Sequence, residues 1–475
     1  MPATPITPRG TSASICYASG LLALHLGDCL EVLPGLAGSS IDAVVTDPPY
    51  GLEFMGQDWD APWAADPGTG KTWDTGMRQP SFSDGASRQA WPSPEPRANV
   101  RCRLCQRWRV SSRPCRCPKP NFPDLHSANM RAYQDWCRQW AGECLRVLKP
   151  GGHLLAFGGT RTWHRLACAI EDTGFEIRDS IHWIHGQGFP KSLNVAKALG
   201  KARRDAPSAR EWNGWGTALK PAHEPIIMAR KPLAGTVAAN VAAYGTGALN
   251  IDRCRVEGTK TVPASPRRAP QGPAYGNLGN DPGNGSGWNP ATGRWPPNLL
   301  LTHSPACEEH GTCAPSCPAA ELDRQSGVLT SGANPARRNP DVVRDIYGEF
   351  PGQRQCAPHR GADSGGASRF FPAFRYQPKA RRAERPRLED GTAHPTVKPV
   401  DLMRWLIRLV TPPGATVLDP FAGTGAMLHA CQLEGIRAIG IERDQTYAEL
   451  CARRLRTVVE PDIDDPAQTP EKSSE

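Results

Sequence analysis

The sequence TVLDPFAGTG at residues 416–425 joins a short apolar strand to a glycine-rich turn, and a helical pattern follows it. Glycines at such a turn let the backbone approach a ligand closely, and the start of the next helix offers free N–H donors. The following strand ends at Glu442, about 20 residues further on, where a carboxylate can accept both hydroxyls of a ribose. The turn and the acid together predict a nucleoside cofactor rather than a purely structural turn. The chain has no G-x-x-x-x-G-K-[ST] sequence, so a nucleoside triphosphate is not indicated.

Apolar and helical segments alternate on both sides of this turn. The apolar runs that predict strands are 21–26, 41–45, 153–157, 175–183, 225–229, 416–418 and 439–441. The segments with helical spacing are 29–36, 133–148, 163–173, 400–410, 425–434 and 446–458. Strands that alternate with helices predict an α/β fold with a doubly wound parallel sheet. Between about 232 and 390 this periodicity disappears, and the sequence predicts an irregular, loop-rich region.

Asp47, Pro48, Pro49 and Tyr50 directly follow the apolar run 41–45, which puts them at the carboxyl end of a predicted strand. The two prolines fix the backbone and lack N–H donors, so carbonyls and a carboxylate are left to accept hydrogen bonds. Such a corner can accept hydrogen bonds from an exocyclic amine, and the Tyr50 ring offers a face for a stacked base. Asp47 and the Pro48 carbonyl would then hold an amino nitrogen for in-line attack on a methyl group. The alternative is a rigid proline turn with no ligand.

Three motifs together resemble those of the DNA amino-methyltransferases: TDPPYG at 46–51, HPTVKP at 394–399, and DPFAGTG at 419–425 with Glu442. The corner comes first and the cofactor turn last, which is similar to the β class of these enzymes. In that class the Rossmann-like methyltransferase sheet is circularly permuted. The resemblance covers about half of the chain, roughly residues 20–60, 130–232 and 390–458.

The resemblance implies transfer of a methyl group from S-adenosylmethionine to an amine of a base flipped out of double-stranded DNA. Asp47 in the first position of the corner, rather than serine, favours the N6 amine of adenine, and cytosine N4 is the alternative. An RNA base or a glutamine side chain also presents a planar NH2, but Asp47 favours DNA. A catalytically inactive, zinc-stapled nucleic-acid-binding protein is the competing hypothesis from another class. It predicts damage to one of the motifs, and none is visibly damaged.

Site residues are carried over from the resemblance position by position. The implied catalytic residues are Asp47, Pro48, Pro49 and Tyr50. The implied binding residues for S-adenosylmethionine are Asp419, Phe421, Ala422, Gly423, Thr424, Gly425 and Glu442. Thr396 and Lys398 would shape the methionine end of the pocket, and Asp28 would contact the cofactor adenine.

The same pattern predicts how the chain is divided. The expected parts are a disordered N-terminus at 1–19, a catalytic half at 20–231, a target-recognition region at 232–390, a cofactor-binding half at 391–458 and an acidic disordered tail at 459–475. The catalytic half contains a cysteine-rich insert at 97–119. Basic residues between 337 and 387, Arg369 among them, are expected to contact DNA phosphates.

Two groups of cysteines have the spacing of metal ligands. Cys102, Cys105, Cys115 and Cys117 predict a small structural zinc knuckle, and unliganded thiols in a basic loop are the alternative. The second group is His303, Cys307, His310, Cys313 and Cys317, and its spacing does not say which four would bind an ion, although Cys307, His310, Cys313 and Cys317 form one such set. For this group, scattered cysteines in a loop-rich region are an equally weighted alternative. Either ion would stabilise a segment that is poor in apolar residues.

Composition limits the compartment and the partners. Lys and Arg number 56 against 47 Asp and Glu, and this net charge of +9 is compatible with a polyanionic partner. No apolar run approaches the roughly 20 residues of a membrane span, and the first ten residues lack an apolar core. Cysteines at metal-ligand spacings fit a reducing compartment, so a cytoplasmic protein is expected. Whether a cognate restriction endonuclease or a second copy of the chain takes part is left open, as is the DNA target.

Overall fold

The computed structural model describes the following residues: 14–51, 104–105, 107, 116–119, 125–185, 188, 192–202, 207–256, 293–304, 306–307, 313–315, 317–331, 363–374 and 397–456. Within these ranges, no helix is both long enough and apolar enough to cross a bilayer.

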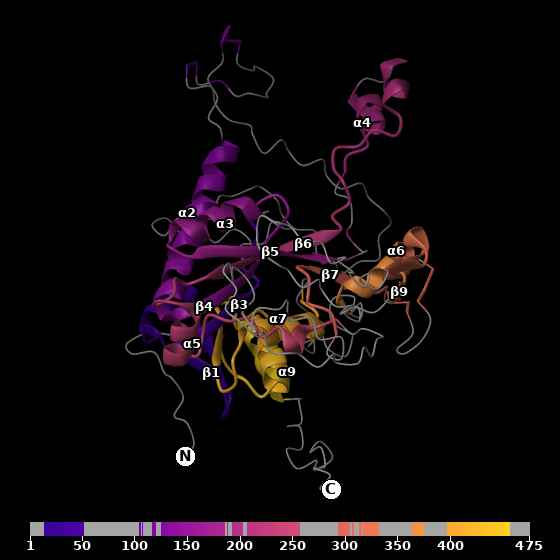
Figure 1. The fold of residues 1–475 in the computed structure, drawn as a ribbon. Helices are drawn as coiled ribbons and strands as arrows, with labels where there is room; N and C mark the ends of the chain where they lie inside the picture. Colours follow the sequence, from indigo (N-terminus) through magenta and orange to yellow (C-terminus); the bar gives the residue numbers. More distant parts are fainter. Residues whose placement is uncertain are drawn as a thin grey trace, which may run out of the picture.

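A mostly parallel sheet of ten strands forms the centre of the protein (Figure 1). In spatial order the strands are β1 (Ser14–Ala18), β2 (Leu22–Leu26), β12 (Arg437–Glu442), β11 (Thr416–Asp419), β3 (Ile41–Thr46), β4 (Leu148–Phe157), β6 (His223–Arg230), β5 (Glu176–Ile184), β7 (Leu299–Thr302) and β10 (Ala373–Phe374). Strand β1 is antiparallel to β2, and β6 is antiparallel to both of its neighbours. The predicted α/β class is confirmed, with these two antiparallel strands added to a parallel frame.

Helices cover both faces of the sheet, which is why its central strands are apolar on both sides. On one face α2 (Leu125–Val147) and α3 (Trp163–Asp172) pack over Val44 of β3. On the other face α7 (Val400–Val410) and α8 (Ala426–Leu433) pack over Ala43 and Val45. Neighbouring residues of β3 therefore belong to opposite cores. Figure 1 shows α2 and α3 on one side of the strands, and α7 and α9 (Gln445–Arg456) on the other.

The order of the strands places a switch point between β11 and β3. From β11 the chain passes through α8 to β12 on one side, whereas from β3 it passes through α2 to β4 on the other. The two strands are parallel neighbours, with Val417 opposite Ala43. Ligands of doubly wound sheets bind at such a point, outside the carboxyl ends of the strands. Because β11 lies near the end of the chain and β3 near its start, the sheet is circularly permuted, as predicted.

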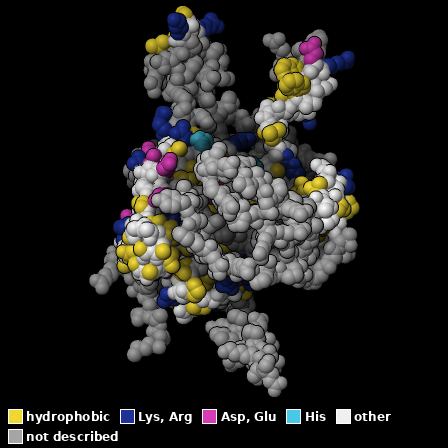
Figure 2. Space-filling model, in the orientation of Figure 1, with side chains coloured by type: hydrophobic (Ala, Val, Ile, Leu, Met, Phe, Trp, Pro, Cys, Tyr) yellow, Lys and Arg dark blue, Asp and Glu magenta, His cyan; other side chains and the backbone are white. Residues whose placement is uncertain are grey.

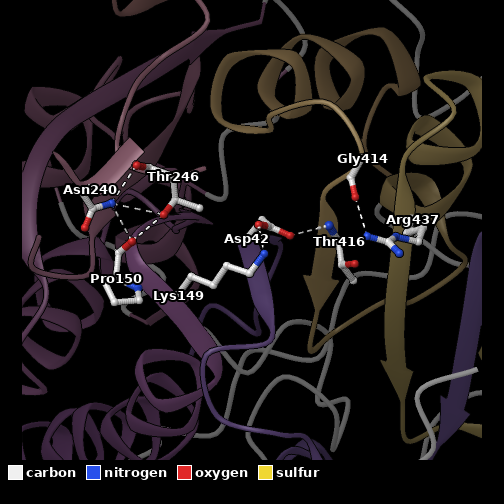
Figure 3. A network of polar contacts seen from close by, with 8 residues as sticks. All are labelled: Asp42, Lys149, Pro150, Asn240, Thr246, Gly414, Thr416 and Arg437. Atoms are coloured by element: carbon white, nitrogen blue, oxygen red, sulfur yellow. Dashed lines mark hydrogen bonds and ion pairs between the residues drawn. The ribbon is translucent and has the colours of Figure 1, made fainter. Parts of the chain in front are cut away.

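Asp42 joins the same two strands at their opposite, amino-terminal ends (Figure 3). One oxygen of its carboxylate lies 2.5 Å from Lys149 Nζ, and the other accepts a 2.8 Å hydrogen bond from the Thr416 backbone N–H. The Asp42 side chain is almost completely buried, so both bonds form in a weakly screened setting. This contact fixes the pairing of β3 with β11 and therefore aligns their carboxyl ends.

One helix lies just past the predicted boundary at residue 231, in the region expected to be irregular. Helix α5 (Val237–Tyr244) is capped by Thr236, whose hydroxyl accepts from Ala239 N–H, and ends at Gly245 with φ 74°. It lies against β4, where Asn240 Nδ2 donates to the Pro150 carbonyl over 2.9 Å (Figure 3). This part of the chain thus belongs to the same body as the sheet.

Two further parts expected to lack regular structure are also ordered. Strand β1 contradicts a disordered segment as far as residue 19, because it pairs with the edge of β2 and Tyr17 packs on the core. Strands β7 and β10 extend the main sheet from within the region 232–390. That region also contains α6 (Pro318–Ser326) and the small antiparallel pair β8 (Leu329–Ser331) and β9 (Asp363–Gly365).

An arm extends away from the sheet between β5 and β6 (Figure 1). It consists of α4 (Val195–Ala202) packed on the 3-10 helix η5 (Pro207–Trp212). Trp212 and Trp215 contact each other there, and both are exposed. Figure 2 shows hydrophobic side chains on this arm beside Lys and Arg side chains.

Candidate active site

The predicted corner and the predicted cofactor turn lie beside each other at the carboxyl edge of the sheet. The corner follows β3, the turn follows β11, and Glu442 ends β12. Thr46 Oγ1 donates a 2.6 Å hydrogen bond to Asp419 Oδ1, which links the last residue of β3 to the last residue of β11. The switch point therefore carries all three features.

Glu442 organises the glycine turn. Its two carboxylate oxygens accept 2.8 Å hydrogen bonds from the backbone N–H groups of Gly423 and Asp444. Burial raises the pKa of Glu442, and these two N–H donors oppose that shift. The carboxylate is thus held at the turn, and each oxygen has a second lone pair with which to accept a ligand hydroxyl.

Both the backbone conformation and the packing at position 425 require glycine. Its φ of 76° lies in the left-handed region, which side chains other than glycine rarely adopt. A Cβ at this position would overlap Cys451 Sγ of α9. Gly423 also has a positive φ, 53°, and its N–H is the one that Glu442 accepts.

The other residues of the turn differ in their surroundings. Asp419 is buried, and burial raises its pKa to about 7, although hydrogen bonds from Thr46 and the Phe421 N–H oppose the shift. Asp419 therefore holds the turn from within, and its predicted part in cofactor binding stays a prediction. Ala422 and Thr424 are also buried, whereas the Phe421 ring is partly exposed and packs edge-to-face on Trp140, with centroids 5.4 Å apart.

Asp28 lies close to Glu442 but has a structural role of its own. Its side chain caps the short helix α1 (Cys29–Val32) by accepting a 2.9 Å hydrogen bond from the Leu30 N–H. The preceding residue, Gly27, donates its N–H to the Glu442 carbonyl over 2.9 Å. This contact brings Asp28 to the carboxyl end of β12.

Four polar side chains converge on the corner: Asp47, Tyr50, Glu224 and Lys398. Lys398 Nζ lies 2.5 Å from Asp47 Oδ2 and 3.3 Å from Glu224 Oε2. Tyr50 Oη lies 2.8 Å from Asp47 Oδ1 and 3.0 Å from Glu224 Oε2, so its single proton serves one carboxylate at a time. Lys398 also donates to the Tyr50 hydroxyl, over 3.1 Å.

Burial and charge have opposing effects on the pKa values of Asp47 and Lys398. Burial raises the pKa of Asp47, the Lys398 ammonium opposes that shift, and Glu224 adds to it. For Lys398, burial lowers the pKa, but the carboxylates of Asp47 and Glu224 together raise it above its ordinary value. The pKa of Tyr50 is far above its ordinary value, because of burial and both carboxylates. The hydroxyl of Tyr50 therefore keeps its proton.

The backbone of the corner is held by two other side chains. Thr162 Oγ1 donates to the Tyr50 carbonyl over 2.6 Å, and Tyr133 Oη donates to the Pro49 carbonyl over 3.3 Å. Pro48 is buried, whereas Asp47 keeps 23% of its side chain exposed. The carboxylate is thus fixed in place and still accessible from one side.

Glu224 is a site residue that the sequence patterns did not indicate. It is the second residue of β6, whereas the predicted site residues lie at the carboxyl ends of strands. Because β6 runs antiparallel to β4, its first residues lie at the same edge as the last residues of β3. Lys398 was assigned to the methionine end of the cofactor pocket, and in the structure its ammonium contacts the carboxylate of the corner. Thr396 lies outside the described residues.

The structure describes more of the second predicted metal site than of the first. Cys102 and Cys115 lie outside the described residues, so the first group stays a prediction. In the second group the ligand atoms of His303, Cys307, Cys313 and Cys317 lie within 4.8 Å of one another, whereas His310 lies outside the described residues.

Arg369, for which a phosphate contact was predicted, bonds to its own loop in the structure. Its guanidinium donates to the carbonyls of Gly365, Gly366 and Leu329, and it lies over the Phe370 ring. The side chain thus holds the loop before β10 together. The other arginines between residues 337 and 387 lie outside the described residues.

The switch point of a doubly wound sheet, a glycine turn with a strand-end carboxylate and a proline-fixed Asp-Tyr corner define an α/β protein of the nucleoside-cofactor-binding class. Residues 41–453 match the profile of the DNA methylase family called N6_N4_Mtase. The chain belongs to this family.

Individual relatives match shorter stretches. The chain is 26% identical over 230 residues to the type II methyltransferase M.HindIII of Haemophilus influenzae. This alignment covers 48% of this chain and 64% of that relative. It is 41% identical over 76 residues to the type II methyltransferase M.HinfI of Haemophilus influenzae, 16% of this chain and 21% of the relative. The chain thus spans less than two thirds of the length of these relatives. Among solved structures, the cytosine-N4-specific PvuII DNA methyltransferase aligns over 95% of this chain and 93% of its own, with 14% identity and a TM-score of 0.37.

Proposed function

We propose that this protein transfers a methyl group from S-adenosylmethionine to the N6 amine of adenine in double-stranded DNA. The main support for the proposal is that the Asp47 corner and the glycine turn lie beside each other at one switch point. Thr46 Oγ1, immediately before the Asp47 corner, is bonded to Asp419, which begins the glycine turn. A cofactor on the turn and an amine on the corner would therefore be neighbours.

The donor set at the turn fits the nucleoside part of S-adenosylmethionine. The Glu442 carboxylate, held by two backbone N–H groups, would accept hydrogen bonds from the ribose hydroxyls. The partly exposed Phe421 ring offers an apolar surface beside it, and Asp28 lies at the adjacent strand end. When bound, the cofactor supplies a methyl group that is activated by the positive charge of its sulfonium.

Asp47 would receive the target amine. Its accessible carboxylate accepts a hydrogen bond from the N–H of the base, and the Pro48 carbonyl would accept the second one. An amine held by two acceptors directs its nitrogen lone pair at the methyl group and can attack in line. With both carboxylates ionised, the cluster of Asp47, Glu224 and Lys398 carries one negative charge in excess, which complements a nearby sulfonium.

Lys398 and Glu224 are inferred to position Asp47 rather than to touch the base. The ammonium favours the ionised form of the Asp47 carboxylate, which is the form that can only accept hydrogen bonds. Glu224 in turn shares Lys398 and the Tyr50 hydroxyl, and so fixes the side of the corner that faces away from the base. Tyr50 would stack on the flipped base through its ring.

The choice of adenine rests on Asp47 as the first residue of the corner, in place of serine. Double-stranded DNA is the expected partner, and flipping is required because an exocyclic amine is inaccessible inside the duplex. The names of the M.HindIII and M.HinfI relatives place those proteins among type II methyltransferases. A role in restriction–modification is accordingly part of the proposal.

The test is incubation with labelled S-adenosylmethionine and unmethylated genomic DNA, followed by mass spectrometry of the nucleosides. The proposal predicts N6-methyladenine. Appearance of N4-methylcytosine instead would support amine methylation and reverse the choice of base. DNA without label, with RNA and protein substrates also unlabelled, would contradict a methyltransferase.

A further inference from the structure

Four side chains of metal-ligand type converge where β7 ends. His303 directly follows the strand, Cys307 and Cys313 lie on the loop that follows, and Cys317 is the N-cap of α6. Cys313 Sγ and Cys317 Sγ each lie 3.4 Å from His303 Nδ1. Zinc lies about 2.3 Å from a thiolate and about 2.0 Å from an imidazole nitrogen, so tetrahedral ligands are roughly 3–4 Å apart. The two separations from His303 match that spacing, and all four ligand atoms lie within 4.8 Å of one another.

The chemistry of these ligands favours zinc in a closed, structural site. Three thiols and one imidazole complete a tetrahedral shell and leave no position for water or substrate. Two backbone N–H groups already point at the sulfurs: Ala314 N–H donates to Cys307 Sγ over 3.3 Å, and Ser304 N–H to Cys317 Sγ over 3.5 Å. Donors of this kind stabilise thiolates and orient them toward a metal.

A metal ion at these four side chains would add a strong link to a series of hydrogen bonds that connects α6, β10 and β7. From Cys317 the chain enters α6, whose Asp323 accepts hydrogen bonds from the Ser368 N–H and hydroxyl over 2.7 and 2.6 Å. The segment after Ser368 leads into β10, where the Phe374 carbonyl accepts a 2.8 Å hydrogen bond from His303 N–H. An ion bound by His303 and Cys317 would therefore join the two ends of this series of hydrogen bonds.

Little apolar packing is available to hold β7 and α6 together without a metal ion. Between β7 and α6, the buried apolar side chains are Leu300, Leu301, Cys317 and Ala319, counted over the described residues alone. A segment with so small a core usually requires a metal or a disulfide to stay folded. Its attachment to the main sheet includes a hydrogen bond from Trp183 Nε1 of β5 to Thr302 Oγ1, 2.6 Å long, next to His303.

We propose that His303, Cys307, Cys313 and Cys317 bind one structural zinc ion, which holds β7, α6 and β10 together against β5. The proposal does not depend on methyl transfer, because it concerns metal content and local folding. It predicts one zinc per chain at this site, in addition to whatever the Cys102–Cys117 group binds.

The first test is metal analysis of the purified full-length protein and of a Cys313→Ser/Cys317→Ser variant. The variant is expected to contain one zinc equivalent less than the wild type. Cys168→Ser, which removes an exposed cysteine outside the group, should leave the zinc content unchanged. Equal metal content in the double variant and the wild type, or iron in place of zinc, would overturn the proposal.

The second test concerns His303. His303→Ala should contain one zinc equivalent less than the wild type. His303→Cys should keep the full zinc content, because a fourth thiolate can complete the shell. Replacement of zinc by cobalt should then give thiolate–cobalt absorption bands that differ between the wild type and His303→Cys. Full zinc content in His303→Ala would exclude this residue as a ligand.

The structural role is tested on the wild-type chain, so that it does not depend on a variant that folds. Removal of the metal by a chelator should raise amide hydrogen exchange in 299–304, 317–331 and 363–374 and leave 416–442 protected. Unchanged exchange after the metal has been lost would contradict the structural role.

Discussion

Lys398 Nζ lies 2.5 Å from Asp47 Oδ2, although 351 positions separate the two residues in the chain. Asp47 follows β3 near the start of the chain, and Lys398 lies two residues before α7 in the C-terminal half. The circular permutation brings these distant segments together at the switch point. The carboxylate proposed to receive the amine is therefore held by a cation from the half that carries the cofactor turn.

Removal of the Lys398 charge should shift the acid limb of the activity profile to higher pH. The ammonium opposes the rise in the pKa of Asp47 that burial causes, so without it the pKa of Asp47 rises further. Since the ionised carboxylate is the form proposed to accept the amine, Lys398→Met should need a higher pH to reach its full rate. Lys398→Arg keeps the charge and should stay close to the wild-type limb. Profiles of kcat/KM against pH that coincide for the wild type and Lys398→Met would exclude this positioning role.

Glu442→Gln should weaken cofactor binding by about 10- to 100-fold, because one hydrogen bond to a charged group contributes about 1.5–3 kcal/mol. Calorimetric titration with S-adenosylmethionine measures the effect, and thermal unfolding checks that the turn still folds. Glu449→Gln, an exposed acid on the neighbouring helix α9, is the matched control. Equal affinities for all three proteins would remove the ribose role from Glu442.

Gly425→Ala should destabilise the fold by about 2 kcal/mol or more. A left-handed φ of 76° costs a non-glycine residue about 1–2 kcal/mol, and the new Cβ overlaps Cys451 Sγ as well. Gly435→Ala is the control, since its φ is 64° and the space around its Cβ is open. Urea unfolding of both variants separates the contribution of packing from that of the backbone.

A double variant tests the named contact. Cys451→Ala should recover part of the stability lost in Gly425→Ala, so the two changes should not be additive. Strict additivity would show that Cys451 is not what resists the added methyl group.

Elements with strong local signals were predictable from the sequence. The predicted helix 400–410 and the structural α7 have the same bounds, and the corner and the turn lie at strand ends as predicted. Two segments were harder to assign for physical reasons. The predicted helix 29–36 divides into α1 and a 3-10 turn at Leu33–Gly35, where Pro34 cannot donate to a continuing helix. Strand β1 has five residues, and its order comes from pairing with β2.

The contacts of the site were less predictable than its location. Glu224 could have been found from the sequence His-Glu-Pro at 223–225, but only with the knowledge that β6 runs antiparallel. Lys398 was found through its motif, yet its contact with Asp47 depends on tertiary structure. The same holds for His303, which the spacing of the cysteines alone could not distinguish from His310.

The central claim is that Asp47 receives the amine while the glycine turn with Glu442 binds the cofactor. The most direct measurement compares wild type and Asp47→Ala for cofactor affinity by titration and for methyl transfer to unmethylated DNA with labelled S-adenosylmethionine. We predict that Asp47→Ala binds the cofactor with nearly unchanged affinity and transfers methyl groups at least about 100-fold more slowly, the effect of removing a group that acts in the transition state. Transfer at the wild-type rate by Asp47→Ala would contradict the account.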